Sequence, residues 1–253
     1  MKTIAGPLLL GIATLLPAIS HANEPGALNA SERPHPESPE TEFLRGATPE
    51  ALIAKARDAI RAMGDYRARL IKTERIKGEV RPAQTIEVLV CHAPHAVRME
   101  FVAGPKAGRR VIWRQDRRPT EILVREGGLL GLTSLWLNGS GGLARGDTNH
   151  AVSEIGFAHV LDVMERDLAN GKAQGGHVRK DLGRDARDLY RIEWVAPAGA
   201  SGLYARRTRF GIDMNLHIPV DIEVFDSQGF LERYEYSNVR ARQTCKTSDL
   251  EDL

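Results

Sequence analysis

Residues 218–239 read IPVDIEVFDSQGFLERYEYSNV and predict two antiparallel strands joined by a tight turn. Ile218 to Phe225 and Phe230 to Val239 are rich in β-branched and aromatic residues, which favour strands. Asp226-Ser-Gln-Gly229 supplies turn-forming residues between them. Neighbouring strands joined by a short turn are antiparallel, because parallel neighbours need a long crossover. The sheet is therefore expected to be antiparallel at this end.

Apolar and polar residues alternate along most of the chain, as they do in strands. Helical spacing replaces this alternation in two places, after Thr48-Pro49-Glu50 up to Gly64, and from Ser153 or Gly156 up to Asn170-Gly171. These features predict an α+β fold with about 10–11 strands. An antiparallel sheet of that length must curve, and the two amphipathic helices are expected to cover its concave side. Before the hairpin, the expected strands are Tyr66–Ile76, Gln84–Cys91, Ala96–Val102, Arg109–Arg114, Glu121–Arg125, His177–Leu182, Asp188–Val195 and Leu203–Ile212.

Composition excludes several classes of protein. The 253 residues include 35 Lys+Arg and 33 Asp+Glu, a balance that argues against a dedicated nucleic-acid binder. Two cysteines are too few for a disulfide scaffold or a four-thiolate zinc site. A charged fraction of 27% argues against a protein with several membrane spans. A soluble mixed α/β protein remains.

The first residues predict export. Lys2 precedes the apolar run Ile4 to Ile19, and Ser20-His21-Ala22 has small residues at the positions that signal peptidase reads. We expect a signal peptide over residues 1–22, cleaved after Ala22, and a periplasmic protein; the alternative is an uncleaved membrane anchor. The expected organisation is then a proline-rich flexible linker (23–46), one domain (47–240) and a polar C-terminal tail (241–253).

Export would place Cys91 and Cys245 in an oxidising compartment. They could form a disulfide, or they could be two separate buried thiols. Sequence alone does not show whether their Cα atoms come within bonding range.

Several motifs resemble a family of exported bacterial proteins of unknown function, of the DUF1571 type, within or near the LolA superfamily. They are YRARLIKTER at residues 66–75, APHAVRM at residues 93–99, Asn149-His150 ahead of Ile155-Gly156, and the hairpin at residues 219–238. That superfamily includes periplasmic lipoprotein carriers, mycobacterial lipid-binding lipoproteins and RseB-type stress sensors. The resemblance implies an unclosed half β-barrel that is lined by apolar side chains, capped by helices and able to hold acyl chains. It implies no catalytic residues.

The apolar faces of the strands are the expected ligand site. Such an interior could be an ordinary dry core, or it could be partly open and admit a lipid chain, which Met and aromatic side chains accommodate well. The residues expected to line it are Val97, Met99, Phe101, Val111, Trp113, Ile122, Val124, Tyr190, Ile192 and Trp194. The residues expected to form a lid on the second helix are Phe157, Leu161 and Met164.

Other candidate sites have ordinary structural interpretations. His92 and His95 are expected in a surface loop, and residues 139–142 in a flexible connector. Asp181, Asp185 and Asp188 are expected in a hairpin turn. Arg-rich strand segments are expected on the solvated face, or at a rim that meets anionic lipid. We predict no metal site, no cofactor and no catalytic constellation.

These observations favour a non-enzymatic periplasmic carrier or sensor that holds the acyl chain of a lipid or lipoprotein. The first alternative is an RseB-like interaction module that docks onto a membrane-anchored protein. The second alternative is an envelope hydrolase of an unrecognised type. None of the three involves nucleic acid.

Overall fold

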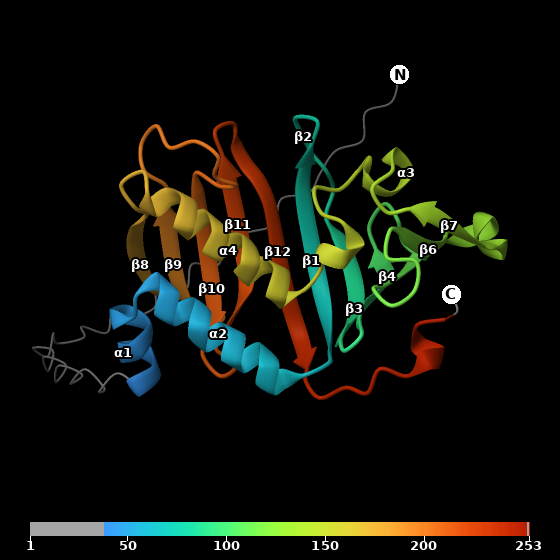
Figure 1. The fold of residues 1–253 in the computed structure, drawn as a ribbon, viewed down its shortest axis with the longest axis horizontal. Helices are drawn as coiled ribbons and strands as arrows, with labels where there is room; N and C mark the ends of the chain where they lie inside the picture. The colour runs from blue at the N-terminus through green and yellow to red at the C-terminus, as the bar shows by residue number, and fades with distance from the viewer. Residues whose placement is uncertain (1–37, 252) are drawn as a thin grey trace, which may run out of the picture. The chain divides into compact units, whose positions relative to one another are not determined.

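The computed structural model describes residues 38–251 and 253, so the expected signal peptide and residues 23–37 of the expected linker lie outside the described residues. The described chain is α+β, with one 12-stranded antiparallel sheet (Figure 1). The strand order is β7-β6-β5-β4-β3-β1-β12-β11-β10-β9-β8, and β2 pairs with β1 beside this path. Because β7 and β8 stand at opposite ends of this order, the curved sheet is unclosed. No helix of the described residues is long and apolar enough to cross a membrane.

The strands are β1 (Tyr66–Ile76), β2 (Glu79–Val80), β3 (Gln84–His92), β4 (His95–Ala103), β5 (Arg110–Arg114), β6 (Glu121–Arg125), β7 (Ser134–Asn138), β8 (Val178–Arg184), β9 (Leu189–Val195), β10 (Arg207–Asp213), β11 (Ile218–Asp226) and β12 (Gly229–Arg240). The α-helices are α1 (Pro39–Gly46), α2 (Pro49–Met63), α3 (Gly142–Arg145) and α4 (Phe157–Lys172). Short 3-10 helices are η1 (Gly128–Leu132), η2 (Val152–Glu154) and η3 (Thr247–Asp249). Two of these strands, β2 and β7, were not among the expected strands.

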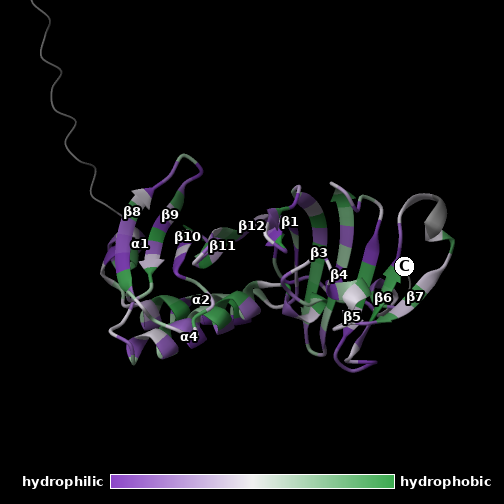
Figure 2. Cartoon of the chain, turned by 90° about the horizontal axis from the view of Figure 1, so that it is seen from above, coloured by the Kyte–Doolittle hydropathy of each residue, from purple (hydrophilic) through white to green (hydrophobic). Residues whose placement is uncertain are grey.

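Alternating side chains build the core on the concave face. Along β1, every second residue from Tyr66 to Ile76 is buried, as the pleat of a strand requires. Figure 2 shows the same alternation of hydrophobic and hydrophilic residues along β3 and β4. Helices α2 and α4 lie side by side across the β8–β12 half of the sheet (Figure 1). The apolar core therefore lies between this sheet and its helices.

Helices α2 and α4 begin at residues that the sequence marks as helix starts. Thr48 caps α2, because its side chain accepts a hydrogen bond from the Ala51 N–H at 3.2 Å. Helix α4 begins after Gly156, whose φ of 123° favours glycine. A Cβ at this position would lie 2.7 Å from Tyr66 Oη. The same hydroxyl accepts a hydrogen bond from the Phe157 N–H at 3.0 Å, so the start of α4 is anchored to β1.

Residues 39–46, expected in the flexible linker, form helix α1 instead. Ser38-Pro39-Glu40 repeats the hydroxyl-Pro-Glu start of α2, and the Ser38 side chain accepts from the Thr41 N–H at 3.2 Å. Leu44 is buried in the main core. The Arg179 guanidinium donates hydrogen bonds to the carbonyls of Leu44 and Ala47, which attaches α1 to β8.

The C-terminal segment, expected as a polar tail, packs against the outer face of the sheet. Cys245 forms a disulfide with Cys91 of β3, with their Cα atoms 6.1 Å apart. Leu250 is buried with Leu89 in a small cluster on that face. These apolar contacts are few, and no periodic pattern in the sequence predicts them.

A row of charged residues crosses the outer face of β9–β11. Gly211 of β10 lies between Arg191 of β9 and Asp221 of β11 in register. Because Gly211 has no side chain, Arg191 reaches across β10 and binds Asp221 at 2.8 Å. Asp221 is only 1% exposed, so this ion pair is largely shielded from water. The strand arginines thus serve cross-strand ion pairs as well as the solvated surface.

Candidate functional site

All ten residues expected to line the interior are buried, with at most 8% of each exposed. They belong to one continuous core with Phe157 and Leu161, and the partly buried Met164 packs against it. The open space next to this core is divided into separate cavities, so the ten residues do not surround a single hollow.

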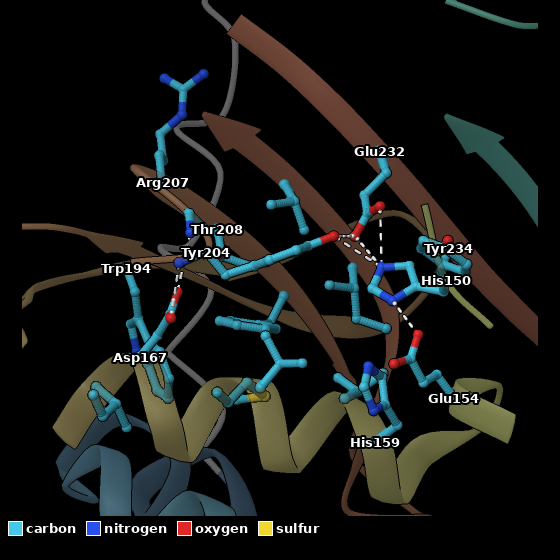
Figure 3. Close-up of a pocket in the computed structure, with 18 of the residues that line it drawn as sticks. His150, Glu154, His159, Asp167, Trp194, Tyr204, Arg207, Thr208, Glu232 and Tyr234 are labelled. Atoms are coloured by element: carbon cyan, nitrogen blue, oxygen red, sulfur yellow. Dashed lines mark hydrogen bonds and ion pairs between the residues drawn. The ribbon is translucent and has the colours of Figure 1, made fainter. Parts of the chain in front are cut away.

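The main cavity lies between α4 and the β9–β12 part of the sheet (Figure 3). Its open space is about 750 Å³ with its mouth included. Of the residues expected from the sequence, Trp194 and Met164 line this cavity. Further apolar side chains around it include Val160, Val163 and Leu168 of α4, and Phe210, Ile222, Val224 and Tyr236 of the sheet.

Two smaller hollows of the interior are lined by residues that were expected from the sequence. One, of about 530 Å³, lies against β4–β6 and is lined by Met99, Phe101, Val111, Ile122 and Val124. The other, of about 420 Å³, lies between the helices and the sheet, where Leu161, Met164, Ile192 and Trp194 line it.

Four expected residues line none of these three cavities. Val97 is fully buried in the core. Trp113 donates its indole N–H to the Pro119 carbonyl at 2.9 Å, and Tyr190 donates to Asp181 at 3.1 Å. Phe157 is fully buried beside the rings of Tyr66 and Tyr236, at centroid distances of 5.0 and 4.5 Å. Phe157 was expected as part of a lid, but it is a fully buried residue of the core.

A buried polar cluster, which was not predicted, forms the inner end of the main cavity. Glu74 of β1 and Glu232 of β12 stand directly opposite each other in the sheet. They are 3% and 2% exposed. Two adjacent buried carboxylates would repel each other and would be poorly solvated, so they require positive partners and hydrogen bonds.

Three side chains form hydrogen bonds with the Glu232 carboxylate. His150 Nε2 lies 3.0 Å from its Oε1 atom, Tyr204 Oη donates to the same oxygen at 2.6 Å, and Asn149 Nδ2 donates to Oε2 at 3.0 Å. Burial alone would raise the pKa of Glu232, but these hydrogen bonds outweigh burial and lower it. Glu232 is therefore held as a carboxylate.

His150 is the cationic partner of Glu232. Burial lowers the pKa of His150, but its contacts with Glu154 and Glu232 and the charge of Glu74 outweigh burial and raise the pKa to about 9. The interaction with His150 in turn lowers the pKa of Glu154 to about 2. The imidazolium thus lies between two carboxylates.

Glu74 has its own set of partners. The Lys72 ammonium lies 2.8 Å from Glu74 Oε2, and the Tyr234 hydroxyl donates to Oε1. The Thr148 hydroxyl and the Asn149 N–H also approach Oε1, each at 3.2 Å. The loop at residues 148–150 therefore closes over both carboxylates.

The sequence does contain a signal for this cluster. Lys72 and Glu74 occupy the same alternating phase as the buried Leu70, and Glu232 shares the phase of Tyr234 and Tyr236. Charged residues at inward-facing strand positions are unusual and indicate a buried site. These residues come together only because β1 pairs with β12, and that pairing is not evident from the sequence.

A hydrogen-bonded loop closes the other side of the main cavity. Asp167 of α4 accepts from the Tyr204 N–H at 2.9 Å and from the Ala205 N–H at 3.0 Å. Gln174 exchanges two hydrogen bonds with the backbone of Ser201, at 2.8 and 3.0 Å. Residues 201–205 are thus held to the C-terminal half of α4. This arrangement places Tyr204 over Glu232.

Two groups of described residues have metal-ligand chemistry. Asp65, Cys91 and Cys245 form one, but both of its sulfur atoms are in the disulfide. His150, Glu154 and His159 form the other, with one potential ligand atom of each within 4.8 Å of the others. Burial and the charge of His150 lower the pKa of His159, so its ring is neutral. No metal site was expected from the sequence, and these residues were not among the expected site residues.

Several solved structures are similar to this chain at low identity. A LolA superfamily protein from Nitrosomonas europaea is 10% identical, with 79% of this chain and 96% of that chain covered and a TM-score of 0.36. The Mycobacterium tuberculosis lipoprotein LppX is 15% identical, with 79% and 100% covered and a TM-score of 0.44. The Pseudomonas aeruginosa MucA/MucB complex gives 12% identity, 85% and 61% coverage, and a TM-score of 0.42.

A search of curated proteins gave no match. Comparison with protein-family models gave a match over residues 63–252, to the family described as "Protein of unknown function (DUF1571)". The match covers the whole sheet and all of the polar cluster, and the chain belongs to this family.

Proposed function

We propose that this protein is a non-enzymatic binding protein of the bacterial cell envelope that holds an acyl chain in the main cavity. The observation that carries the proposal is the lining of that cavity, which is mostly apolar along α4 and β9–β11, with Asp167, Arg207 and Thr208 among it, and which ends at the buried polar cluster. A cavity with one long apolar wall and one polar end matches the two parts of an amphiphile.

Apolar contact would supply most of the affinity. Each buried methylene contributes about 0.8 kcal/mol, so about ten of them would contribute roughly 8 kcal/mol before the costs of association. Met164 of α4 lies in the lining, and its flexible thioether can repack around chains of different shape. Entry of a long chain would require α4 to move away from the sheet.

Trp194 supports an oxygen-containing ligand. Its side chain is 5% exposed, and its indole N–H has no hydrogen-bond partner among the described residues. A buried donor without a partner is costly, by about 1–3 kcal/mol. A carbonyl oxygen of a bound acyl ester would satisfy it.

The proposed organisation is one exported domain behind a cleaved signal peptide. The disulfide between Cys91 and Cys245 supports an oxidising compartment, because cytosolic thiols are kept reduced. A periplasmic location would bring the cavity into contact with lipids and lipoproteins in transit.

The test compares two matched Val→Phe variants. Val224 lines the main cavity and Val124 lines the separate hollow, and the two are 4% and 6% exposed. Each protein is purified from the periplasm of a bacterial host and analysed by native mass spectrometry and lipid extraction. We expect acyl lipid on the wild type and on Val124→Phe, and its loss from Val224→Phe. Absence of lipid from the wild type, or equal lipid on both variants, would contradict the proposal.

One surface observation favours a second function, docking of a protein partner. Leu135 and Trp136 of β7 are 61% and 43% exposed, and β7 is an edge strand. An exposed apolar edge can pair with a strand of another protein. If docking at β7 is the main role, Leu135→Lys should abolish capture of an envelope partner and leave bound lipid unchanged.

A further inference from the structure

We propose that His150, Glu154 and His159 form a zinc site at the polar end of the main cavity. They lie within ten residues of one another, on the loop before η2, at the end of η2 and in the first turn of α4. One potential ligand atom of each lies within 4.8 Å of the other two. Figure 3 shows the three side chains gathered at the same end of the cavity.

The best-defined separation in this group suits zinc better than a hydrogen bond. His150 Nδ1 and Glu154 Oε2 are 3.5 Å apart, which exceeds the usual 2.7–3.2 Å of an N–H···O hydrogen bond. Two ligands at about 2.0–2.1 Å from a tetrahedral zinc ion lie about 3.4 Å from each other. A zinc ion therefore fits between these atoms with little movement of either side chain.

His159 supplies a ligand that has no other role in the described structure. Its Nε2 atom is buried and has no hydrogen-bond partner among the described residues. Its ring contacts that of His150 edge-on, with the centroids 5.4 Å apart. A small rotation of the ring would bring a nitrogen to the metal.

The surroundings orient the other two ligands. His150 binds the Glu232 carboxylate through Nε2, at 3.0 Å, and its Nδ1 faces Glu154. Zinc would bind Nδ1 by displacing its proton to solvent, so that the ring becomes a neutral ligand. This is the carboxylate–histidine–zinc arrangement, in which the outer carboxylate fixes the ring and increases its basicity. Glu154 Oε2 accepts a hydrogen bond from the Ala151 N–H at 2.7 Å, which holds the carboxylate in place.

Three protein ligands leave a fourth coordination position open. All three ligands line the main cavity, so a fourth ligand can approach the metal from the space proposed for the acyl chain. A water molecule or an oxygen of a bound head group would occupy it. The zinc site does not depend on acyl-chain binding, and the two proposals can fail separately.

The experiment measures metal binding by the full chain without a histidine tag. After treatment with EDTA, Zn²⁺ is titrated by calorimetry, and Co²⁺ is added to record the visible absorption of a tetrahedral site. We expect one metal ion per chain. We expect His159→Ala to weaken Zn²⁺ binding by more than about 100-fold, and Glu232→Gln by roughly 10–100-fold. Glu154→Gln, which preserves the shape of the side chain, provides a second ligand variant if His159→Ala does not fold.

His177→Ala is the matched control, because His177 lines the same cavity and also has a buried ring nitrogen without a partner among the described residues. Its Zn²⁺ affinity should equal that of the wild type. Absence of Zn²⁺ binding by the wild type would overturn the proposal, and the cluster would then be only an ion-pair network. Equal affinity of His159→Ala and the wild type, or equal losses in His159→Ala and His177→Ala, would also overturn it. Lipid analysis of the EDTA-treated protein tests acyl-chain binding separately.

Discussion

Replacing Asp167 with Asn tests how the main cavity is closed. The Asp167 carboxylate is 8% exposed and accepts hydrogen bonds from two backbone N–H groups, those of Tyr204 and Ala205. Asn has nearly the same shape but only one acceptor oxygen, so one buried N–H would face an NH₂ group. Leaving that N–H unpaired costs about 1–3 kcal/mol, and replacing a charged acceptor by a neutral one at the other bond costs about 1 kcal/mol.

The expected loss in unfolding free energy is therefore about 2–4 kcal/mol. In a domain of this size it corresponds to a fall in Tm of roughly 4–16 °C. Urea denaturation followed by circular dichroism measures the change. Asp162→Asn is the control, because Asp162 lies on the same helix with 61% of its side chain exposed and pairs with Arg57 at the surface. We expect the control to lose less than about 1 kcal/mol.

A change of less than about 0.5 kcal/mol in Asp167→Asn, the level typical of a surface substitution, would refute this role of Asp167. Equal losses in both variants would refute it as well. Because Asp167 holds the loop that carries Tyr204, the variant should also exchange bound lipid faster. Stopped-flow displacement of a fluorescent acyl chain measures that rate.

Three further predictions concern the sheet. Burial raises the pKa of Asp221, but neighbouring arginines outweigh burial and lower it. Its contribution to stability is thus present above about pH 4 and is lost as the pH falls, so Asp221→Asn should flatten the acid limb of unfolding free energy against pH. Replacing Cys91 and Cys245 by Ser opens a link across a sequence separation of 154 residues. Loss of the disulfide should lower the free energy of unfolding by up to roughly 5 kcal/mol, and an unchanged midpoint of denaturant unfolding would contradict this. Gly211→Ala places a Cβ 2.7 Å from the Arg191 guanidinium. The substitution should lower the free energy of unfolding by about 1–3 kcal/mol. In a double-mutant cycle, the effects of Gly211→Ala and Asp221→Asn on that free energy should not be additive.

Much of the fold could be predicted because its signals are local. Alternation along the strands indicated an antiparallel sheet, and the Thr48-Pro49-Glu50 start and the Gly64 end of α2 lie within one short segment. Helix α1 has the same kind of start at Ser38, but the prolines before it favoured a flexible linker. Burial of Leu250 under the outer face depends on contacts that are distant in sequence.

The site could be predicted only in part, because it depends on long-range pairing. The apolar faces of the strands were recognisable in the sequence, and all ten strand residues expected to line the interior are buried. Which of them border open space depends on the position of α4 over the sheet. Glu74 and Glu232 are far apart in the chain and meet only because β1 pairs with β12. Both glutamates occupy inward-facing positions of their strands, which the sequence shows. The site itself could be predicted only with knowledge that these two strands pair.

Quenching of Trp194 by a brominated acyl chain reports directly on whether the chain enters the main cavity. The chain has three tryptophans, so Trp113→Phe with Trp136→Phe leaves Trp194 as the only fluorescent indole. Bromine quenches tryptophan on contact, and Trp194 lines the main cavity. We predict saturable quenching in this variant, and none in the matched variant that retains only Trp136. Unquenched Trp194, or equal quenching in both variants, would contradict binding of the chain in the main cavity.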